Sequence, residues 1–290
     1  MTLRGIFVPL ITPFTDAGPV DEPSLRKVAE SVLSAGAAGL VALGTTGEPA
    51  TLTPAERATV VATCRDFGVP LLVGVGGSST AACAAEVAAL PVGTVAMVVV
   101  PPYTRPGEAG VITHFRAVTA SARVPVVIYH VPYRTGQPLS TAALLEIAAM
   151  PGVVGVKLSD GAVSAATVAL LAGAPPGFAV LGGDDAVISP LLALGAHGGI
   201  LASAHVATAA YATLHTAWHD GDVATARALG GRLAALSEAL FAEPNPAVIK
   251  AVLHARGRIA SPAVRLPLLP ASAAARDRAL DLLSRIEPTP

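Results

Sequence analysis

The stretch "PVVIYHVPYRTGQPLSTAALLEIAAMPGVVGVKL" (residues 125–158) has a short apolar run at each end and an alanine-rich segment between them. The runs 125–130 and 153–158 are rich in β-branched residues, which is typical of strands buried on both faces. Residues 140–150 have the composition of a helix. A strand, a helix and a second strand in this order favour a parallel sheet.

The same alternation continues along most of the chain. Residues 21–36 and 53–68 have helical patterns, and "TPAE" at 53–56 supplies Thr53 as a cap, Pro54 in the first turn and Glu56 as the capping-box acid. Eight consecutive strand–helix units favour a closed (β/α)8 TIM barrel over an open doubly wound sheet. The predicted strands are 5–10, 39–44, 70–75, 94–100, 125–130, 153–158, 178–183 and 198–203.

The last part of the chain has helical patterns only. We predict that residues 1–220 form the α/β barrel and that residues 221–290 form a C-terminal helical extension packed on it. No linker rich in glycine, serine or charge separates the two parts.

The composition excludes several classes of partner. A formal net charge of -1 leaves no basic surface for nucleic acid or an anionic membrane. The chain is 52% hydrophobic, but prolines and glycines interrupt its uncharged tract 186–219, so we expect no membrane-spanning helix. The first residues have too short an apolar region for a signal peptide. We therefore expect a soluble, cytoplasmic protein.

The sequence offers no pattern for a metal or a disulfide framework. Cys64 and Cys83 are too few and too isolated, and we expect two small core residues in a reducing compartment. The histidines have no metal-ligand spacing, and "GGDD" (182–185) is a single acidic pair. We expect no metal and no cofactor.

Lys157 is the next-to-last residue of the apolar run 153–158, and no acidic residue stands directly beside it. Lysine is rarely buried unless it is paired or used. Apolar surroundings disfavour the ammonium form, and a neutral amine can attack a ketone to form a Schiff base. The alternative is a lysine that extends to solvent or pairs with an acid from another loop. These residues alone leave both interpretations open.

Other reactive residues follow predicted strands, and the active site of a barrel lies at the carboxyl ends of its strands. The phenol of Tyr129 could move protons, although a buried tyrosine is more often a core residue. The "GTTGE" loop (44–48) could bind a carboxylate with its hydroxyls and amides, or simply connect a strand to a helix. Arg134 could hold a second carboxylate, or be solvated.

Taken in order along the chain, five motifs form a specific set: "GTTGE" at 44–48, "YHVPYRTG" at 129–136, "GVKL" at 155–158, "GGDD" at 182–185 and "EPNP" at 243–246. With the "PLITPF" start at 9–14, this set resembles the dihydrodipicolinate synthase / N-acetylneuraminate lyase family of Schiff-base pyruvate lyases. The likeness spans nearly the whole chain and is greatest to the synthase branch.

The resemblance implies a (β/α)8 barrel, a homotetramer built from tight dimers, and keto acid and aldehyde substrates. Lys157 matches the Schiff-base lysine, so pyruvate would be held as a covalent imine without a cofactor. The remaining assignments follow by position: Thr45, Thr46 for the pyruvate carboxylate; Tyr129, Thr45, Tyr103 for a hydroxyl relay, with Tyr103 from the neighbouring subunit; Gly183, Ile200 for the pyruvate pocket.

The second substrate is harder to assign. Arg134 is similar to the arginine that binds the carboxylate of L-aspartate 4-semialdehyde in the synthases. The family pattern is usually acidic after the lysine, where this chain has Leu158 and Ser159, and His130 and Tyr133 replace a common Asn and Ser. Positions that bind feedback lysine in other synthases are here Ser78, Ala82, Pro102, so we expect insensitivity to lysine.

Three functions stay open at this point. The first is a synthase that condenses pyruvate with L-aspartate 4-semialdehyde. The second is an aldolase for 2-keto-3-deoxy sugar acids or N-acetylneuraminate on the same scaffold. The third is a paralogue that binds a keto acid without turning it over. Imine formation separates the third from the other two.

Overall fold

The computed structural model describes residues 3–286 and shows a closed parallel barrel whose strands run in sequence order from β1 to β8. The predicted fold class is confirmed. The eighth strand ends earlier than we predicted, because residues 201–203 already form the turn into the next helix. The strands are β1 Gly5–Pro9, β2 Gly39–Ala42, β3 Leu71–Val75, β4 Thr94–Val99, β5 Val126–His130, β6 Val153–Leu158, β7 Ala179–Gly182 and β8 Gly198–Ile200.

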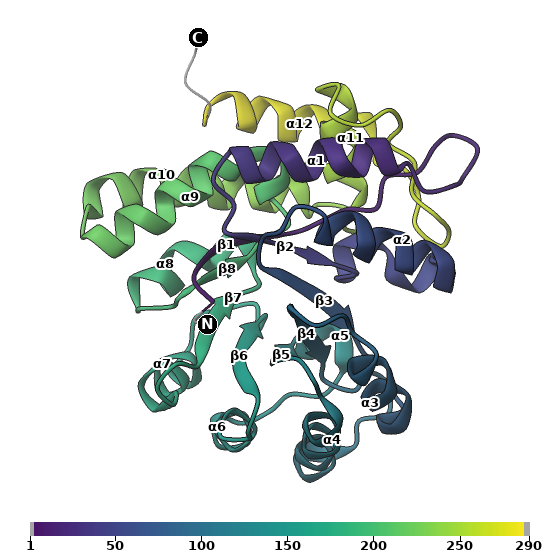
Figure 1. Ribbon diagram of the computed structural model, residues 1–290. Coiled ribbons are helices and arrows are strands. Elements are labelled where there is room, and N and C mark those ends of the chain that lie inside the picture. The colour runs from purple at the N-terminus through teal and green to yellow at the C-terminus, as the bar shows by residue number, and fades with distance from the viewer. Residues whose placement is uncertain (1–2, 287–290) are drawn as a thin grey trace. The chain divides into compact units, whose positions relative to one another are not determined.

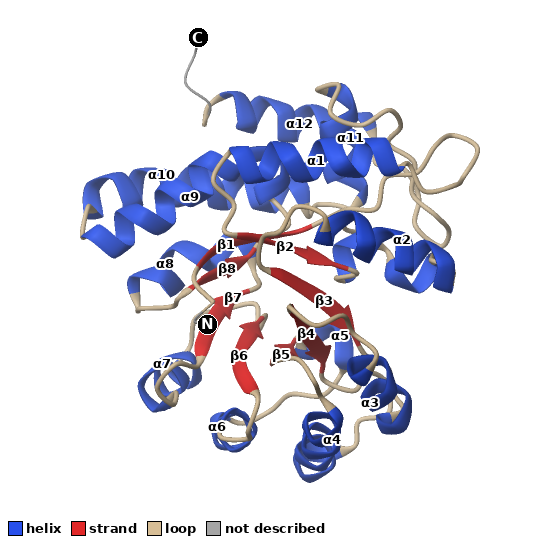
Figure 2. Cartoon of the chain, viewed as in Figure 1, coloured by secondary structure: helices blue, strands red, loops and turns tan. Residues whose placement is uncertain are grey.

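Helices alternate with these strands along the chain (Figure 2). Three short helical turns lie in two of the connections: η1 Thr45–Gly47 and η2 Pro49–Thr51 between β2 and α2, and η3 Asp185–Val187 after β7. The α-helices are α1 Glu22–Ser34, α2 Pro54–Arg65, α3 Thr80–Ala88, α4 Gly107–Ser121, α5 Pro132–Thr135, α6 Thr141–Ala148, α7 Ala165–Gly173, α8 Ile188–Ala193, α9 Ala204–Asp220, α10 Val223–Leu240, α11 Ala247–Ala255 and α12 Ala273–Ser284.

The predicted capping box begins α2. The Thr53 hydroxyl accepts from the Glu56 backbone N–H at 3.3 Å, and Glu56 Oε2 accepts from the Thr53 N–H at 2.8 Å. Both groups satisfy amides that a helix start leaves without intrahelical partners. The local sequence therefore decides where this helix begins.

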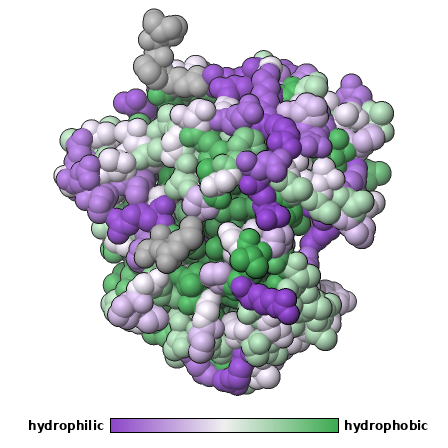
Figure 3. All heavy atoms as spheres, viewed as in Figure 1, coloured by the Kyte–Doolittle hydropathy of each residue, from purple (hydrophilic) through white to green (hydrophobic). Residues whose placement is uncertain are grey.

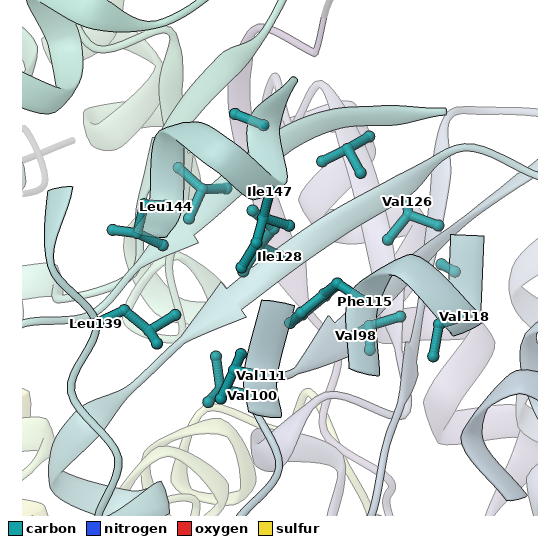
Figure 4. Packing of buried hydrophobic residues seen from close by; sticks show 14 of the residues in the cluster. Val98, Val100, Val111, Phe115, Val118, Val126, Ile128, Leu139, Leu144 and Ile147 are labelled. Atoms are coloured by element: carbon teal, nitrogen blue, oxygen red, sulfur yellow. The ribbon is translucent and has the colours of Figure 1, made fainter. Parts of the chain in front are cut away.

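The chain divides into two compact units, and the first consists mainly of Pro70–Gly199. In this unit α3, α4, α6 and α7 lie along the strands β3–β6 (Figure 1). Their apolar faces bury one side of the sheet: Phe115 of α4 and Ile147 of α6 belong to one cluster with Val98 of β4 and Ile128 of β5 (Figure 4). Because successive strand residues face opposite sides, Tyr129 is directed to the other, inner face of the sheet.

The second unit combines Gly5–Val69 with residues 200–286. It holds β1, β2 and the helices α1, α2 and α9–α12, and α9 lies beside α10 (Figure 1). The buried Tyr211 hydroxyl of α9 lies 2.7 Å from Ser237 Oγ of α10. The residues predicted as a helical extension contain α10, α11 and α12 up to residue 286, and positions 287–290 lie outside the described residues. The boundary near residue 220 stays a prediction.

Apolar residues lie both in the buried core and on the surface. The face seen in Figure 3 shows hydrophobic residues interspersed with hydrophilic ones. Within residues 3–286, no helix has both the length and the apolar character needed to cross a bilayer.

Candidate active site

The chain has three lysines, and the structure gives each a different environment. Lys27 is exposed and donates to the Gly257 carbonyl at 2.7 Å. Lys250 of α11 is 0% exposed and forms an ion pair with Glu48. Lys157 of β6 is 6% exposed, and no carboxylate in the described part of the chain forms an ion pair with it. Lys157 is thus the buried amine without a paired charge.

Lys157 and Tyr129 lie side by side at the carboxyl ends of neighbouring strands. The two residues are partners in the parallel register of β5 and β6. Lys157 Nζ is 4.2 Å from the centroid of the Tyr129 ring, whose face attracts a cation. The flanking Val156 and Leu158 belong to the apolar cluster on the outer face, so Lys157 points to the inner face. The structure brings these two predicted residues together.

Gly183, which follows β7, makes room for the lysine side chain. Its N–H donates to the Leu158 carbonyl at 2.7 Å. A Cβ at this position would lie 2.7 Å from Lys157 Cε and 2.1 Å from Ser159 Oγ. A side chain at this position would have to displace both groups, so Gly183 borders the lysine side chain.

The loop after β6 contains groups to which the sequence analysis gave no role. Buried His130 of β5 forms an ion-pair contact with Asp160, with Nε2 and Oδ1 3.0 Å apart. The Gly161 N–H donates to Asp184 Oδ2 at 2.6 Å. These contacts join the loop to the ends of β5 and β7. Asp160 could have been found, because it follows a predicted strand end at the edge where His130 also ends its strand.

Burial has the largest effect on the pKa of Asp184, which lies in the loop after β7. Desolvation raises the pKa of Asp184, while the Gly161 hydrogen bond and the charge of Lys157 oppose this rise. The Ser159 hydroxyl is buried between Lys157 and Gly183 and has no partner among residues 3–286. Leu158, by contrast, packs outward. The two residues that depart from the family pattern after Lys157 therefore differ: Ser159 lies near the lysine side chain, and Leu158 packs into the outer cluster.

Arg134 lies on the short helix α5, immediately after β5. Its Nε donates to the Tyr133 hydroxyl at 3.1 Å, and its guanidinium carbon is 5.2 Å from the Tyr133 ring centroid. Both side chains are exposed. The remaining N–H groups of Arg134 can bind a carboxylate.

Tyr103 lies in the loop after β4 and extends into solvent. It is 91% exposed and has a positive φ of 71°. Its N–H donates to the Thr135 carbonyl at 3.1 Å, which ties this unusual backbone conformation to α5. The Tyr103 hydroxyl forms no hydrogen bond with any residue of 3–286, so no contact in the single chain joins it to Lys157. A relay through Tyr103 requires the predicted second subunit.

The predicted carboxylate-binding residues lie in the second unit. Thr45 and Thr46 form the turn η1 directly after β2, and Thr46 is 4% exposed. Asn245 Nδ2 donates to Thr46 Oγ1 at 2.9 Å. The carbonyl of Gly47 accepts from Thr12 Oγ1 at 2.7 Å. The end of β8 is formed by Ile200, which is buried.

Buried charged groups hold the loop 44–48 in place. Glu48, in the left-handed region with φ 53°, accepts from Lys250 Nζ and, at 2.9 Å, from the Arg265 N–H. Burial lowers the pKa of Lys250 to about 8, and the Glu48 carboxylate opposes this shift. The sequence analysis missed Lys250, although a lysine within the apolar run "AVIKAVL" is the same kind of signal that selected Lys157.

Side chains that could bind a metal ion together are also absent from the described residues. Across residues 3–286, no group of three or more histidine, cysteine, aspartate or glutamate side chains is arranged to hold a metal ion.

Comparison with known proteins agrees with this arrangement. The sequence model of the Dihydrodipicolinate synthetase family matches residues 2–286. The chain belongs to this family. A relative in the family, the 4-hydroxy-tetrahydrodipicolinate synthase of Methanothrix thermoacetophila, is 37% identical over 98% of this chain and 97% of its own.

Solved structures of dihydrodipicolinate synthases share the fold. The enzyme of Acinetobacter baumannii, crystallised with pyruvate, has a TM-score of 0.92 and 33% identity over 98% of both chains. The enzyme of Cyanidioschyzon merolae, crystallised with lysine, has a TM-score of 0.90 and 28% identity over 97% of both chains. Membership of the dihydrodipicolinate synthetase family confirms the resemblance and favours the synthase over the alternatives.

Proposed function

We propose that this protein is a 4-hydroxy-tetrahydrodipicolinate synthase, which condenses pyruvate with L-aspartate 4-semialdehyde. The observation that carries the proposal is Lys157, a buried lysine without a paired charge beside the Tyr129 ring, in a chain whose relatives have this activity in their names. No cofactor is needed, since the lysine itself supplies the covalent chemistry.

The reaction starts at the Lys157 amine. The amine attacks the C2 carbonyl of pyruvate to give a carbinolamine, which loses water to form an imine. Loss of a proton from C3 converts the imine to an enamine. The enamine carbon then attacks the aldehyde carbon of the semialdehyde, whose oxygen takes up a proton. The amino group of the second substrate finally attacks the imine carbon, closes the ring and releases the Lys157 amine.

The other predicted residues bind substrates or move protons in this scheme. Tyr129 moves protons on and off the carbinolamine oxygen. Thr45 and Thr46 bind the pyruvate carboxylate, and Arg134 binds the carboxylate of the semialdehyde. Gly183 and Ile200 border pyruvate. Tyr103 acts from a neighbouring subunit, which requires at least a dimer. The family resemblance extends this to a homotetramer built from tight dimers, and we place the enzyme in the cytoplasm.

Two measurements test the proposal. Borohydride reduction in the presence of pyruvate should add one reduced pyruvate per chain, and peptide mapping should place it on Lys157. The Lys157→Arg variant should gain no adduct, whereas the exposed-site control Lys27→Ala should gain it fully. A coupled assay with L-aspartate 4-semialdehyde, run beside a panel of 2-keto-3-deoxy acids, then identifies the substrate. An adduct on another lysine, or turnover of the keto-deoxy acids alone, would contradict the proposal.

A further inference from the structure

Asn245 and Thr46 are 199 residues apart in sequence and share a hydrogen bond in the second unit. Asn245 Nδ2 donates to Thr46 Oγ1 at 2.9 Å. The other amide atom, Asn245 Oδ1, is buried and accepts no hydrogen bond from the described residues. Among the described residues, the Asn245 amide therefore makes one hydrogen bond, which it donates to the Thr46 hydroxyl.

The direction of this bond matters for the Thr46 hydroxyl. A threonine hydroxyl has one hydrogen to donate and two lone pairs to accept with. The N–H of Asn245 occupies a lone pair, so the hydroxyl hydrogen must point away from Asn245. Within residues 3–286 no acceptor takes this hydrogen. A buried donor without a partner is costly unless a ligand accepts from it.

Both ends of the bond are firmly held. The Glu48 carboxylate, two residues after Thr46, is paired with Lys250, five residues after Asn245. Lys250 Nζ also donates to the Ala263 carbonyl at 2.8 Å. Two contacts between the same segments fix their distance, so the orientation of the Thr46 hydroxyl does not depend on one flexible side chain.

We propose that Asn245 is a positioning residue that keeps the Thr46 hydroxyl as a hydrogen-bond donor to the carboxylate of the keto acid. This inference rests on the proposed function, in which Thr46 binds that carboxylate. An acceptor at position 245 would take the hydroxyl hydrogen, and Thr46 would then present a lone pair to the anion. Asparagine at 245 thus selects an anionic substrate without touching it.

The test compares two variants at this position. Asn245→Asp keeps the size of the side chain but replaces the donor by an acceptor. The Thr46 hydrogen turns to the new carboxylate, and the KM for pyruvate should rise about 10- to 100-fold. Asn245→Ala leaves the hydroxyl free to rotate, and the KM should rise by only a few-fold. The KM for the aldehyde should change in neither variant.

A purely structural role predicts the opposite order, because Asp fills the space of Asn and Ala does not. Thr12→Val serves as the matched control, since it removes the hydrogen bond to the Gly47 carbonyl in the same turn and leaves the Thr46 hydroxyl intact. Its melting temperature should fall as in Asn245→Ala, while its KM for pyruvate stays near that of the wild type. A KM of Asn245→Asp at or below that of Asn245→Ala would overturn the proposal.

A second measurement uses only the Ala variant, in case Asn245→Asp does not fold. Borohydride trapping is run with pyruvate and with methyl pyruvate, which lacks the anionic carboxylate. The Ala variant should lose apparent affinity for pyruvate and keep that for the ester; equal losses would contradict the positioning role. If the wild type traps no pyruvate at all, the proposed function has failed and not the role of Asn245.

Discussion

Lys157 Nζ lies 4.2 Å from the centre of the Tyr129 ring, and the two residues are register partners on β6 and β5. Their proximity follows from strand alternation, because both occupy the inner-face position of adjacent parallel strands. The ring covers one side of the Lys157 amine, so the hydroxyl of Tyr129 belongs to a residue already in contact with that amine.

Tyr129→Phe keeps the ring beside Lys157 and removes only the hydroxyl. We expect the rate of imine formation to fall by about 100-fold or more, since proton transfer by a positioned acid or base contributes at least that much. The melting temperature should change little because the ring remains in place. Borohydride trapping followed over time measures the rate. Wild-type trapping kinetics in this variant would exclude Tyr129 as the proton carrier.

Arg134→Ala should separate the two substrates. Arg134 is exposed and free to form a charge-assisted hydrogen bond, so its loss should raise the KM for L-aspartate 4-semialdehyde about 10- to 100-fold. Trapping of pyruvate on Lys157 should stay unchanged. The control is Arg116→Ala, which removes an exposed arginine of α4 whose ion pair with Glu146 is on the surface. Equal losses in trapping and turnover would speak against the assigned role of Arg134.

L-lysine should not inhibit the enzyme. Ser78 Oγ donates to the Pro102 carbonyl at 2.9 Å, so the hydroxyl is already engaged. Neither Ala82 nor Pro102 offers a carboxylate or a phenol to the ammonium group of lysine. We expect the same rate with and without L-lysine at saturating pyruvate. A saturable inhibition curve in the millimolar range would show that another site binds lysine.

His205 should make folding stability depend on pH. Its Nε2 accepts from the Ile11 N–H at 3.0 Å, its Nδ1 lies 2.8 Å from the Ala202 carbonyl, and burial lowers its pKa from 6.5 to about 4. Between pH 6.5 and pH 4, His205 is protonated in the unfolded chain and neutral in the folded chain. The free energy of unfolding should therefore fall as the pH falls from 6.5 to 4, by at most about 3 kcal/mol.

The contribution of His205 is isolated by comparison with His205→Gln, whose amide can accept and donate at the same two places. Urea unfolding at several pH values gives the free energy of unfolding of each protein as a function of pH. The difference in this free energy between the wild type and the variant should narrow below pH 6.5. Parallel curves for the two proteins would show that His205 is not the titrating group.

The two cysteines should be inert in the folded protein. Cys64 and Cys83 are buried, and burial raises their pKa values to about 12 and about 11. The thiolate, which is the reactive form, is therefore scarce at neutral pH. A disulfide reagent at pH 8 should label neither thiol natively and both in denaturant. Rapid native labelling of either residue would contradict this environment.

The sequence by itself determined the order of elements, because strand and helix periodicities and caps are local properties. It placed the strands to within a few residues, and it placed Lys157 and Tyr129 at the ends of two of them. It also placed a cap at Thr53. The family motifs then assigned roles, although composition and spacing alone left those roles open.

Only the tertiary structure decided which buried lysine is available for chemistry. Lys157 and Lys250 both lie in apolar runs, and nothing local distinguishes them. Lys250 is paired with Glu48, 202 residues away, while Lys157 has a neutral ring beside it. Asn245 and Thr46 are likewise far apart in sequence, and only the fold brings them into hydrogen-bond contact. Partners so distant in sequence are chosen by the fold, because a side chain's charge and hydrogen-bond environment depends on its neighbours in space.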